Sequence, residues 1–489
     1  MIDLQPPRPA HGKQKPTLAV KIFYGFGQAI ESGYIGVAAF IFFYYTAVLG
    51  LSGGMVGLAL AISMAVDAVF DPLIGSISDN VRSRFGRRLP PMVLGAPLFA
   101  LSLGLLFSPP VGLAPFVLFA WLTVFKLSIR AFASLFNLPY FALGAEMADG
   151  YVERSSIVAY RTFGGLITGV LLTILAYSVF FAGPGGLQTA ERYPAFGWAM
   201  AGLLLGSAAI CCVGVWAYSV RLPQPITPTK SVVLSLGPEV LEIFRNRSFR
   251  TLFLSALVVY VAAGLNGALN TYAYIFVWGL QPQQIQTITF AYILGIAFGV
   301  PVTPILLRRM EKRTAVMLGL LFVLSSWVVL PLLRANGLFM PTGANALPWI
   351  AGNVGWAGFG TGFLAIAYPS MMADAADEHE VLFGSRREGL YFAGLGFANK
   401  AAAGLGALLG GVSIDLMKFP KDAGRHIGVA LPEPLLSHLV LAWGPAAAVL
   451  GAISTLMLLP YAITRTRHEE IAEQLRLKRA DDVSAGRST

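Results

Sequence analysis

The chain has few of the groups from which soluble proteins build cross-linked, metal-binding or catalytic sites. Its 489 residues include two cysteines, five histidines and only 12% charged residues. Cys211 and Cys212 are adjacent in an apolar run, which excludes a disulfide framework and the ligand spacing of a zinc site. The motifs H-E-x-x-H and G-x-x-x-x-G-K-[ST] are absent. The sequence therefore predicts no cofactor, no zinc hydrolase and no direct use of ATP.

Long apolar segments fill most of the chain instead. Hydrophobic residues make up 56% of it, and the mean hydropathy is +0.68, more apolar surface than a soluble protein of this length can bury. A helix needs roughly 20 apolar residues to cross a bilayer, where the backbone must satisfy its own hydrogen bonds. Twelve segments qualify, near residues 18–49, 55–78, 91–108, 112–144, 157–182, 195–220, 250–279, 286–307, 314–333, 347–374, 389–416 and 436–464. We predict an all-α membrane protein.

Lys and Arg residues cluster in alternate loops, which predicts the orientation of the spans. The loops at 50–54, 108–112 and 281–286 contain none, although Lys418, Lys421 and Arg425 make one outer loop an exception. Basic clusters lie in the N-terminal tail and at Arg82 to Arg88, 221–250, Arg308 to Arg313, Arg386 with Arg387, and from Arg465 onward. The positive-inside rule then places both termini in the cytoplasm, at a bacterial inner membrane. The same short clusters explain the net charge of +10 without nucleic-acid binding.

One long polar insertion, residues 221–249, divides the chain into two halves. The segment before the first span is polar, and the apolar run after it is too long for a signal peptide. We therefore expect a cytoplasmic tail at 1–17, six-helix bundles at 18–220 and 250–464, a cytoplasmic loop at 221–249 and a cytoplasmic tail at 465–489. Such duplication is typical of major-facilitator transporters.

Several ionisable groups fall inside the predicted spans, where each costs a few kcal/mol. Those near mid-depth are Glu31, Asp67, Lys126, Arg130 and Lys400, and Asp71 and Arg161, together with the neutral polar Asn137, lie closer to the cytoplasm. So many costly groups favour a transport site over a passive anchor. The alternative is that they form fixed salt bridges that hold the bundle together.

Asp67 and Asp71 are four residues apart and share one face of a helix. Two carboxylates in a low dielectric repel, so they share a proton, bind a cation or pair with a base. Each outcome predicts a site that couples an ion to transport. Lys126 and Arg130 repeat the spacing with the opposite charge.

Neutral polar and aromatic side chains in the spans offer contacts for a solute. Asn266 and Asn270 share another helix face and either contact a substrate or hydrogen-bond a neighbouring helix. Tyr140 is an aromatic candidate for stacking on a sugar ring, although most membrane aromatics serve packing.

An ordered series of motifs resembles the glycoside-pentoside-hexuronide:cation symporters, the melibiose-permease-like branch of the major facilitator superfamily. The series covers nearly the whole chain. It consists of Tyr24-Gly25-Phe26-Gly27, Asp67 to Pro72, Arg82 to Arg88, Asn137-Leu138-Pro139-Tyr140, Glu153-Arg154, Tyr160-Arg161, Met372 to Asp377, Arg386 to Gly389 and Lys400. The resemblance implies the major-facilitator fold, with twelve helices in two six-helix halves.

The resemblance also implies roles for individual residues. Asp67, Asp71, Ser134 and Lys400 match the cation site, and Arg161 matches an arginine near the sugar. The expected substrate residues are Glu31, Lys126, Arg130, Asn137, Tyr140, Arg161, Asn266 and Asn270. The expected gating residues are Asp79, Arg82, Arg84, Arg87, Arg88, Asp374, Asp377, Arg386 and Glu388.

Departures from the family pattern change what is expected of the ion and the solute. Phe70 stands where melibiose-type members have an asparagine ligand for sodium, which favours a proton over sodium as coupling ion. The sugar-clamping acids of that permease fall at Ser32 and Asn137, so galactoside specificity is not supported. Lys126 and Arg130 indicate an anionic alternative, such as a uronide or a lysolipid.

Two rival classes explain less of the sequence. Gly50 to Gly54 satisfies the hydrolase pattern G-x-S-x-G, but as a short turn between spans it lacks the strand-to-helix elbow. A membrane scaffold leaves the intramembrane charges unexplained. We therefore predict a non-enzymatic secondary transporter that moves a sugar-like solute with H+ or Na+ by alternating access. We expect contacts with the solute and membrane lipid, no nucleic acid and no obligate protein partner.

Overall fold

The computed structural model describes residues 16–81, 83–148, 150–220, 241–385, 387–421, 423–425 and 431–484. Every regular element in these ranges is helical. The helices of the first half are α1 (Leu18–Phe26), α2 (Ala29–Phe43), α3 (Gly53–Asn80), α4 (Leu89–Leu106), α5 (Pro115–Glu146), α6 (Tyr151–Ile174) and α7 (Arg192–Ser219). Those of the second half are α9 (Arg247–Tyr272), α10 (Pro282–Leu307), α11 (Lys312–Ala335), α12 (Leu347–Phe383), α13 (Glu388–Leu416), α14 (Glu433–Trp443) and α15 (Pro445–Leu458).

Short segments complete the spans and the turns. Three π-helical segments, η1 (Tyr44–Val48), η2 (Leu175–Phe180) and η5 (Ala273–Val277), extend α2, α6 and α9 without a break. Turns of 3-10 helix, η3 (Gly186–Gln188), η6 (Gly343–Asn345) and η7 (Ala423–Arg425), lie in loops. A final helix, α16 (Arg465–Ser484), follows the last span.

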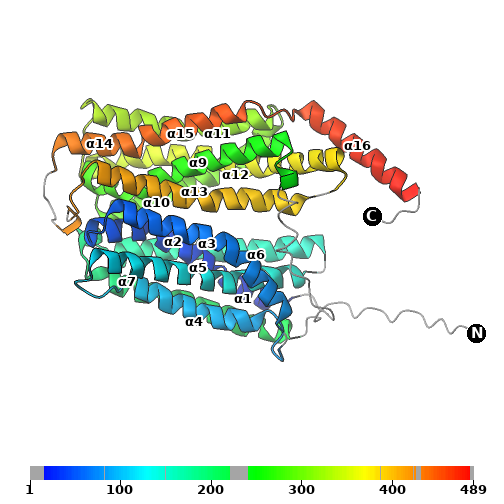
Figure 1. Ribbon diagram of the computed structural model, residues 1–489, viewed down its shortest axis with the longest axis horizontal. Helices are drawn as coiled ribbons and strands as arrows, with labels where there is room; N and C mark the ends of the chain where they lie inside the picture. The colour runs from blue at the N-terminus through cyan, green and yellow to red at the C-terminus, as the bar shows by residue number, and fades with distance from the viewer. Residues whose placement is uncertain are drawn as a thin grey trace, which may run out of the picture.

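The helices form two bundles that run side by side along the long axis of the molecule (Figure 1). Helices α1 to α7 make one bundle, and α9 to α15 make the other. The first described helix, α1, and the last, α16, lie at the same end of the molecule (Figure 1), which agrees with an even number of crossings. We call this the terminal end and the opposite one the distal end.

Length and composition make this a multi-pass membrane protein. Among the described residues, eleven helical stretches are long and apolar enough to cross a bilayer. The remaining predicted span is α3, which has 28 residues and begins with the apolar stretch Gly53–Asp67. The count of twelve therefore depends on α3, whose second part carries the acidic residues that the sequence singled out.

Several helix boundaries follow from local chemistry. Asn246 caps α9 by accepting a hydrogen bond from the Phe249 amide, and Gln281 with Gln284 forms a reciprocal capping box on α10. Gly384 ends α12 with φ at 79°, a left-handed conformation that glycine adopts without steric cost.

Helices α3 and α13 form the main contact between the bundles. Gly53 and Gly57 of α3 lie so close to the backbone of α13 near Gly411 and Leu408 that an added Cβ atom would collide with it. Small residues thus let the two backbones approach. This packing carries Lys400, on α13, to the acidic face of α3.

Hydrogen bonds join the bundles at the distal end. The Asp415 carboxylate of α13 accepts from the Ser52 hydroxyl (2.6 Å) and from the amides of Gly53 (2.9 Å) and Gly54 (2.7 Å), which begin α3. Further cross-bundle bonds there link Tyr272 to Thr46 (2.7 Å), Ser178 to Gln286 (2.5 Å) and Gln188 to Ala423 (3.4 Å). These contacts hold the two bundles together at the distal end.

The segment expected as a tail from residue 465 is helical and docks on the second bundle. Ile471 and Leu475 of α16 are buried in a cluster with α9 and α12. His468 approaches Asp374 (3.3 Å) and Arg479 approaches Glu380 (3.3 Å) on α12. The other predicted domain limits near 1–17 and 221–249 fall largely outside the described residues.

Candidate functional site

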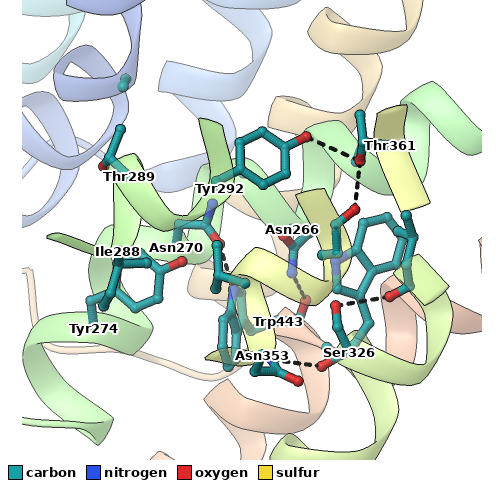
Figure 2. Close-up of a pocket in the computed structure, with 18 of the residues that line it drawn as sticks. Asn266, Asn270, Tyr274, Ile288, Thr289, Tyr292, Ser326, Asn353, Thr361 and Trp443 are labelled. Carbon is teal, nitrogen blue, oxygen red and sulfur yellow. Dashed lines mark hydrogen bonds between the residues drawn. The ribbon is translucent and has the colours of Figure 1, made fainter. Parts of the chain in front are cut away.

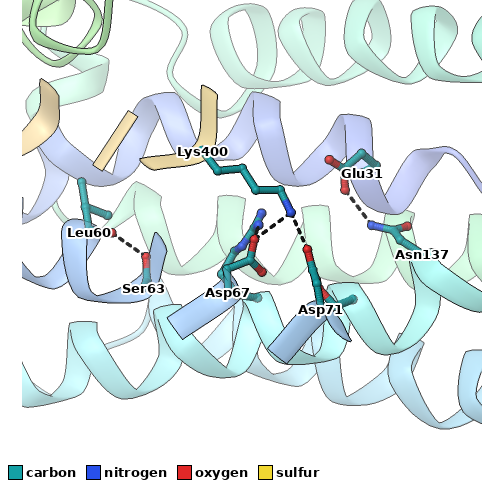
Figure 3. Close-up of polar contacts among 9 residues, drawn as sticks. Glu31, Leu60, Ser63, Asp67, Asp71, Asn137 and Lys400 are labelled. Atoms are coloured by element: carbon teal, nitrogen blue, oxygen red, sulfur yellow. Dashed lines mark hydrogen bonds and ion pairs between the residues drawn. The ribbon is translucent and has the colours of Figure 1, made fainter. Parts of the chain in front are cut away.

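The acidic pair of α3 lies between two basic side chains from different helices (Figure 3). Lys400 of α13 places its Nζ 2.8 Å from an Asp67 carboxylate oxygen and 2.6 Å from an Asp71 oxygen. Arg130 of α5 forms an ion pair with Asp67, and the Ser134 hydroxyl donates to Asp71 at 2.5 Å. Asp67 is completely buried, whereas the Asp71 and Lys400 side chains are 27% and 42% exposed.

Charge balance explains how two carboxylates persist one helical turn apart. Asp67 and Asp71 contribute two negative charges, and Arg130 and Lys400 contribute two positive ones, so the four-residue cluster is neutral when all are ionised. Buried ionic groups are stable only when they are paired in this way. We call these four residues the coupling cluster. One oxygen of Asp67, Oδ1, is buried and has no hydrogen-bond partner among the described residues.

The predicted cation-site residues are thus in mutual contact, and one predicted substrate residue joins them. The sequence expected Arg130 to contact the solute, but here its guanidinium pairs with Asp67. The sequence did contain a pattern that indicates this pairing. Arg130 and Ser134 are four residues apart, so they share the face of α5 that meets α3.

Glu31 and Asn137 form a second polar pair close to the coupling cluster (Figure 3). The Asn137 amide donates to the Glu31 carboxylate at 2.6 Å, from α5 to α2. Arg161 of α6 is half-buried and lies over the Phe141 ring at 5.0 Å. Tyr140 is fully buried, stacks on Tyr24 at 4.4 Å and donates its hydroxyl to the Tyr24 carbonyl, so this ring is closed to a solute in this conformation.

Lys126 is a buried cation that lies beside Tyr34. Only 1% of it is exposed, and its Nζ lies 4.5 Å from the centre of the Tyr34 ring, with Arg130 over the same ring at 4.9 Å. Among the described residues, no carboxylate lies within ion-pair distance of Lys126. An aromatic face stabilises an ammonium by about 2 kcal/mol when both are desolvated, less than burying the charge costs. A negatively charged solute would supply the missing partner.

The remaining predicted substrate residues, Asn266 and Asn270, line a cavity in the second bundle (Figure 2). Its volume is about 580 Å³, within the range of small-molecule sites. Its walls come from α9, α10, α11, α12 and α14, and Ala39 and Tyr177 add contacts from the first bundle. No charged side chain of the described residues lines it.

The predicted gating residues of the first bundle lie at the terminal end. Arg87 and Arg88 both donate to Glu146, at the end of α5, with closest distances of 2.6 and 2.7 Å. Arg84 is exposed, and its guanidinium lies 4.7 Å from the Phe85 ring. Arg82 lies outside the described residues, as does the side chain of Asp79.

In the second bundle, Asp374 accepts from Lys312 at 2.7 Å, which ties α12 to the start of α11. Asp377 lies on α12, Glu388 begins α13, and Arg386 is outside the described residues. Sequence reasoning missed the partners Glu146 and Lys312, and also Asp415 at the distal end. These three residues belong to none of the family motifs, so no pattern in the sequence identified them.

The chain is similar to known transport proteins. A family model described as "MFS/sugar transport protein" matches residues 23–465. An uncharacterized symporter of Synechocystis sp. is 24% identical, over 96% of this chain and 98% of its own. An isoprimeverose transporter of Lactiplantibacillus pentosus is 24% identical, over 77% of this chain and 75% of its own.

A solved structure shares the fold. It is a bacterial homolog of the human lysosomal transporter Spinster in an inward-facing, unoccupied conformation. It superposes with a TM-score of 0.62 at 13% identity, over 90% of this chain and 95% of that one.

Proposed function

Because the chain belongs to the MFS/sugar transport protein family, we propose that it is a secondary active symporter of a small sugar-like solute, coupled to a proton in preference to sodium. Family and relatives make the chain a membrane transporter and not an enzyme. The observation that carries the proposal is the coupling cluster, in which ionisable groups from both bundles meet between α3 and α13.

Protonation of the cluster would change the tie between the bundles. A proton on Asp71 removes one of the two carboxylate charges that hold Lys400, which leaves Lys400 paired with Asp67 alone. The attraction between the two bundles at mid-depth then falls. This shifts the equilibrium between the outward-facing and inward-facing conformations of alternating access. Coupling is reciprocal, so a solute that favours the protonated state must raise the affinity for the proton.

The ligands around the acidic pair favour a proton. Sodium requires several oxygen ligands at once, whereas a proton needs one carboxylate oxygen. Arg130 and Lys400 form ion pairs with the two carboxylates from two sides, and the Phe70 side chain contributes no oxygen. Ser134 is the one other side-chain oxygen recorded in contact with the pair among the described residues.

Uptake by purified protein in lipid vesicles tests this function. Vesicles with an imposed inward proton gradient should accumulate a labelled glycoside, and a protonophore should abolish the accumulation. A sodium gradient at constant pH should drive little accumulation. Equal uptake with and without every ion gradient would contradict symport, and uptake driven by sodium alone would contradict the choice of ion.

An anionic solute is the second candidate, and Lys126 is the observation that favours it. A buried ammonium without a carboxylate partner is expensive unless a ligand neutralises it. Competition between a neutral glycoside and the uronide of the same sugar decides between the candidates. Stronger inhibition of uptake by the uronide would favour the anionic solute, and equal or weaker inhibition would favour the neutral one.

We also propose that both termini face the cytoplasm of a bacterial inner membrane. The basic residues Arg87, Arg88, Lys312 and Arg313 lie at the terminal end, as the positive-inside rule requires for a cytoplasmic face. An impermeant thiol reagent should label a cysteine placed at Gly112 in intact cells and should not label one placed at Arg313. The reverse result would invert the topology.

A further inference from the structure

We propose that the cavity of the second bundle is a recognition subsite for an uncharged, hydroxyl-bearing ring of the solute. The inference rests on the proposed transport function and deepens it: solute identity is read mainly by the second bundle, whereas the coupling cluster is carried mainly by the first. Three asparagines, the aromatic walls and the absence of lining charge within the described residues support it.

The amide orientation of each of the three asparagines is fixed, because its hydrogen-bond partner can either only donate or only accept. Asn270 Oδ1 lies 2.7 Å from Trp443 Nε1, which is a donor, so the Asn270 NH₂ group is left to donate elsewhere. Asn266 and Asn353 donate to the backbone carbonyls of Trp443 (2.8 Å) and Ser326 (3.0 Å), which are acceptors. Their own Oδ1 atoms are left to accept.

The cavity therefore presents the NH₂ group of Asn270 and the amide oxygens of Asn266 and Asn353, none of which has a protein partner among the described residues (Figure 2). Asn266 and Asn270 are four residues apart on α9, and Asn353 faces the cavity from α12. A hydroxyl both donates and accepts, so adjacent ring hydroxyls can satisfy a mixed set of this kind. A purely apolar ligand would leave these three remaining groups unpaired.

Aromatic rings supply the other half of a ring-binding site. Tyr274, Tyr292, Trp327 and Trp443 all line the cavity. Their flat faces suit the C–H face of a sugar ring, and the polar groups set which hydroxyls fit. Because charge is excluded from this lining, a carboxylate or phosphate on the solute would have to lie outside the cavity.

The position of the cavity connects it to the transport path. Ala39 of α2 and Tyr177 of η2, both from the first bundle, contribute to its wall. A ring seated in it therefore touches both bundles and senses their relative movement. A ligand can shift that equilibrium only through such differential contacts.

Gly267 allows the cavity to be filled without displacing protein atoms. It lines the cavity, and a Cβ atom added to it meets no atom within 4 Å. Gly267→Leu should therefore occupy ligand space while the helix retains its fold. The matched control is Gly202→Leu on α7, where an added Cβ also meets nothing within 4 Å and the residue does not line the cavity. Asn353→Ala removes one acceptor by a different route.

The experiment measures binding of nitrophenyl pyranosides by quenching of tryptophan fluorescence, since Trp327 and Trp443 line the cavity. The protein is held in lipid nanodiscs, because a sugar-headed detergent would compete. We expect Gly267→Leu to weaken binding by at least about tenfold and Asn353→Ala by about threefold, as expected for blocked space and one lost hydrogen bond. Gly202→Leu should bind as the wild type does.

The outcomes separate this inference from the proposed function. Wild-type affinity in both cavity variants would overturn the subsite and leave symport intact. Binding that depends on Gly267, without ion-driven accumulation, would support the subsite and contradict symport. Failure of the wild type to bind either a pyranoside or a nucleoside overturns the subsite. A nucleoside that binds to the wild type and is blocked by Gly267→Leu supports the subsite and names a different uncharged hydroxylated ring as its ligand.

Discussion

Asp71→Asn separates the movement of the solute from the movement of the ion. The substitution retains the shape of the side chain and an oxygen that can accept from Ser134, but it removes one negative charge. Lys400 then keeps Asp67 as its partner. The cluster changes from two negative and two positive charges, net zero, to a net charge of +1.

The size of the effect follows from Coulomb's law. A unit positive charge about 5 Å from an uncompensated one is repelled by about 3 kcal/mol at an effective dielectric constant of 20. That energy corresponds to a loss of roughly a hundredfold in the affinity of Asp67, the one carboxylate left in the cluster, for the coupling ion. Because Asp71 is 27% exposed, water screens part of this repulsion, and the measured loss should be smaller. The variant also resembles the protonated state, so downhill movement of the solute should continue.

Vesicles give the two readouts needed. Wild-type protein should accumulate labelled glycoside above the external concentration under a proton gradient, whereas Asp71→Asn should only equilibrate it. The matched control is Glu433→Gln, which neutralises a carboxylate paired with Arg334 at the distal end and should accumulate solute normally. Full accumulation by Asp71→Asn would refute the assignment of the acidic pair to coupling.

Three further substitutions test other parts of the account. Lys126→Met should raise the thermal stability of the ligand-free protein by about 1 kcal/mol, because it removes a buried charge that has no carboxylate partner among the described residues. It should also weaken the inhibition of uptake by uronides. A drop in stability without loss of uronide binding would contradict this role. Asp415→Asn weakens the cap on α3 by about 1 kcal/mol, so cysteine labelling at the distal end should increase about fivefold, and unchanged labelling would show that the cap does not hold that end closed. Glu146→Gln takes the carboxylate from Arg87 and Arg88, and a fall of about 2 kcal/mol in unfolding free energy is expected by thermal denaturation, whereas none would make the contact incidental.

The fold was largely predictable because a bilayer restricts what a backbone can do. Apolar length located each crossing, and the periodicity of four residues placed Asp67 and Asp71 on one helix face. Their contact with Lys400, which is 329 residues from Asp71 along the chain, came from the family resemblance and not from local pattern.

Features that depend on packing between helices were not predictable. The cap that Asp415 provides for α3 requires two glycine-lined backbones to meet, and no spacing within either helix records that meeting. The cavity combines five helices of the second bundle with contacts from the first, so its neutral lining becomes visible only when they are assembled. Tyr140 is the opposite case. Its place in a family motif predicted contact with a solute, but its ring packs on Tyr24 and does not face open space.

Solute-induced proton movement tests the central claim most directly. Purified protein in vesicles, with the membrane potential clamped at zero and sodium absent, is given glycoside while a pH-sensitive dye reports the external solution. The account predicts that the solution becomes more alkaline as solute and protons enter together, and that Asp71→Asn gives solute entry without a pH change. Solute entry by the wild-type protein with no proton movement, or an undiminished pH change in Asp71→Asn, would contradict it.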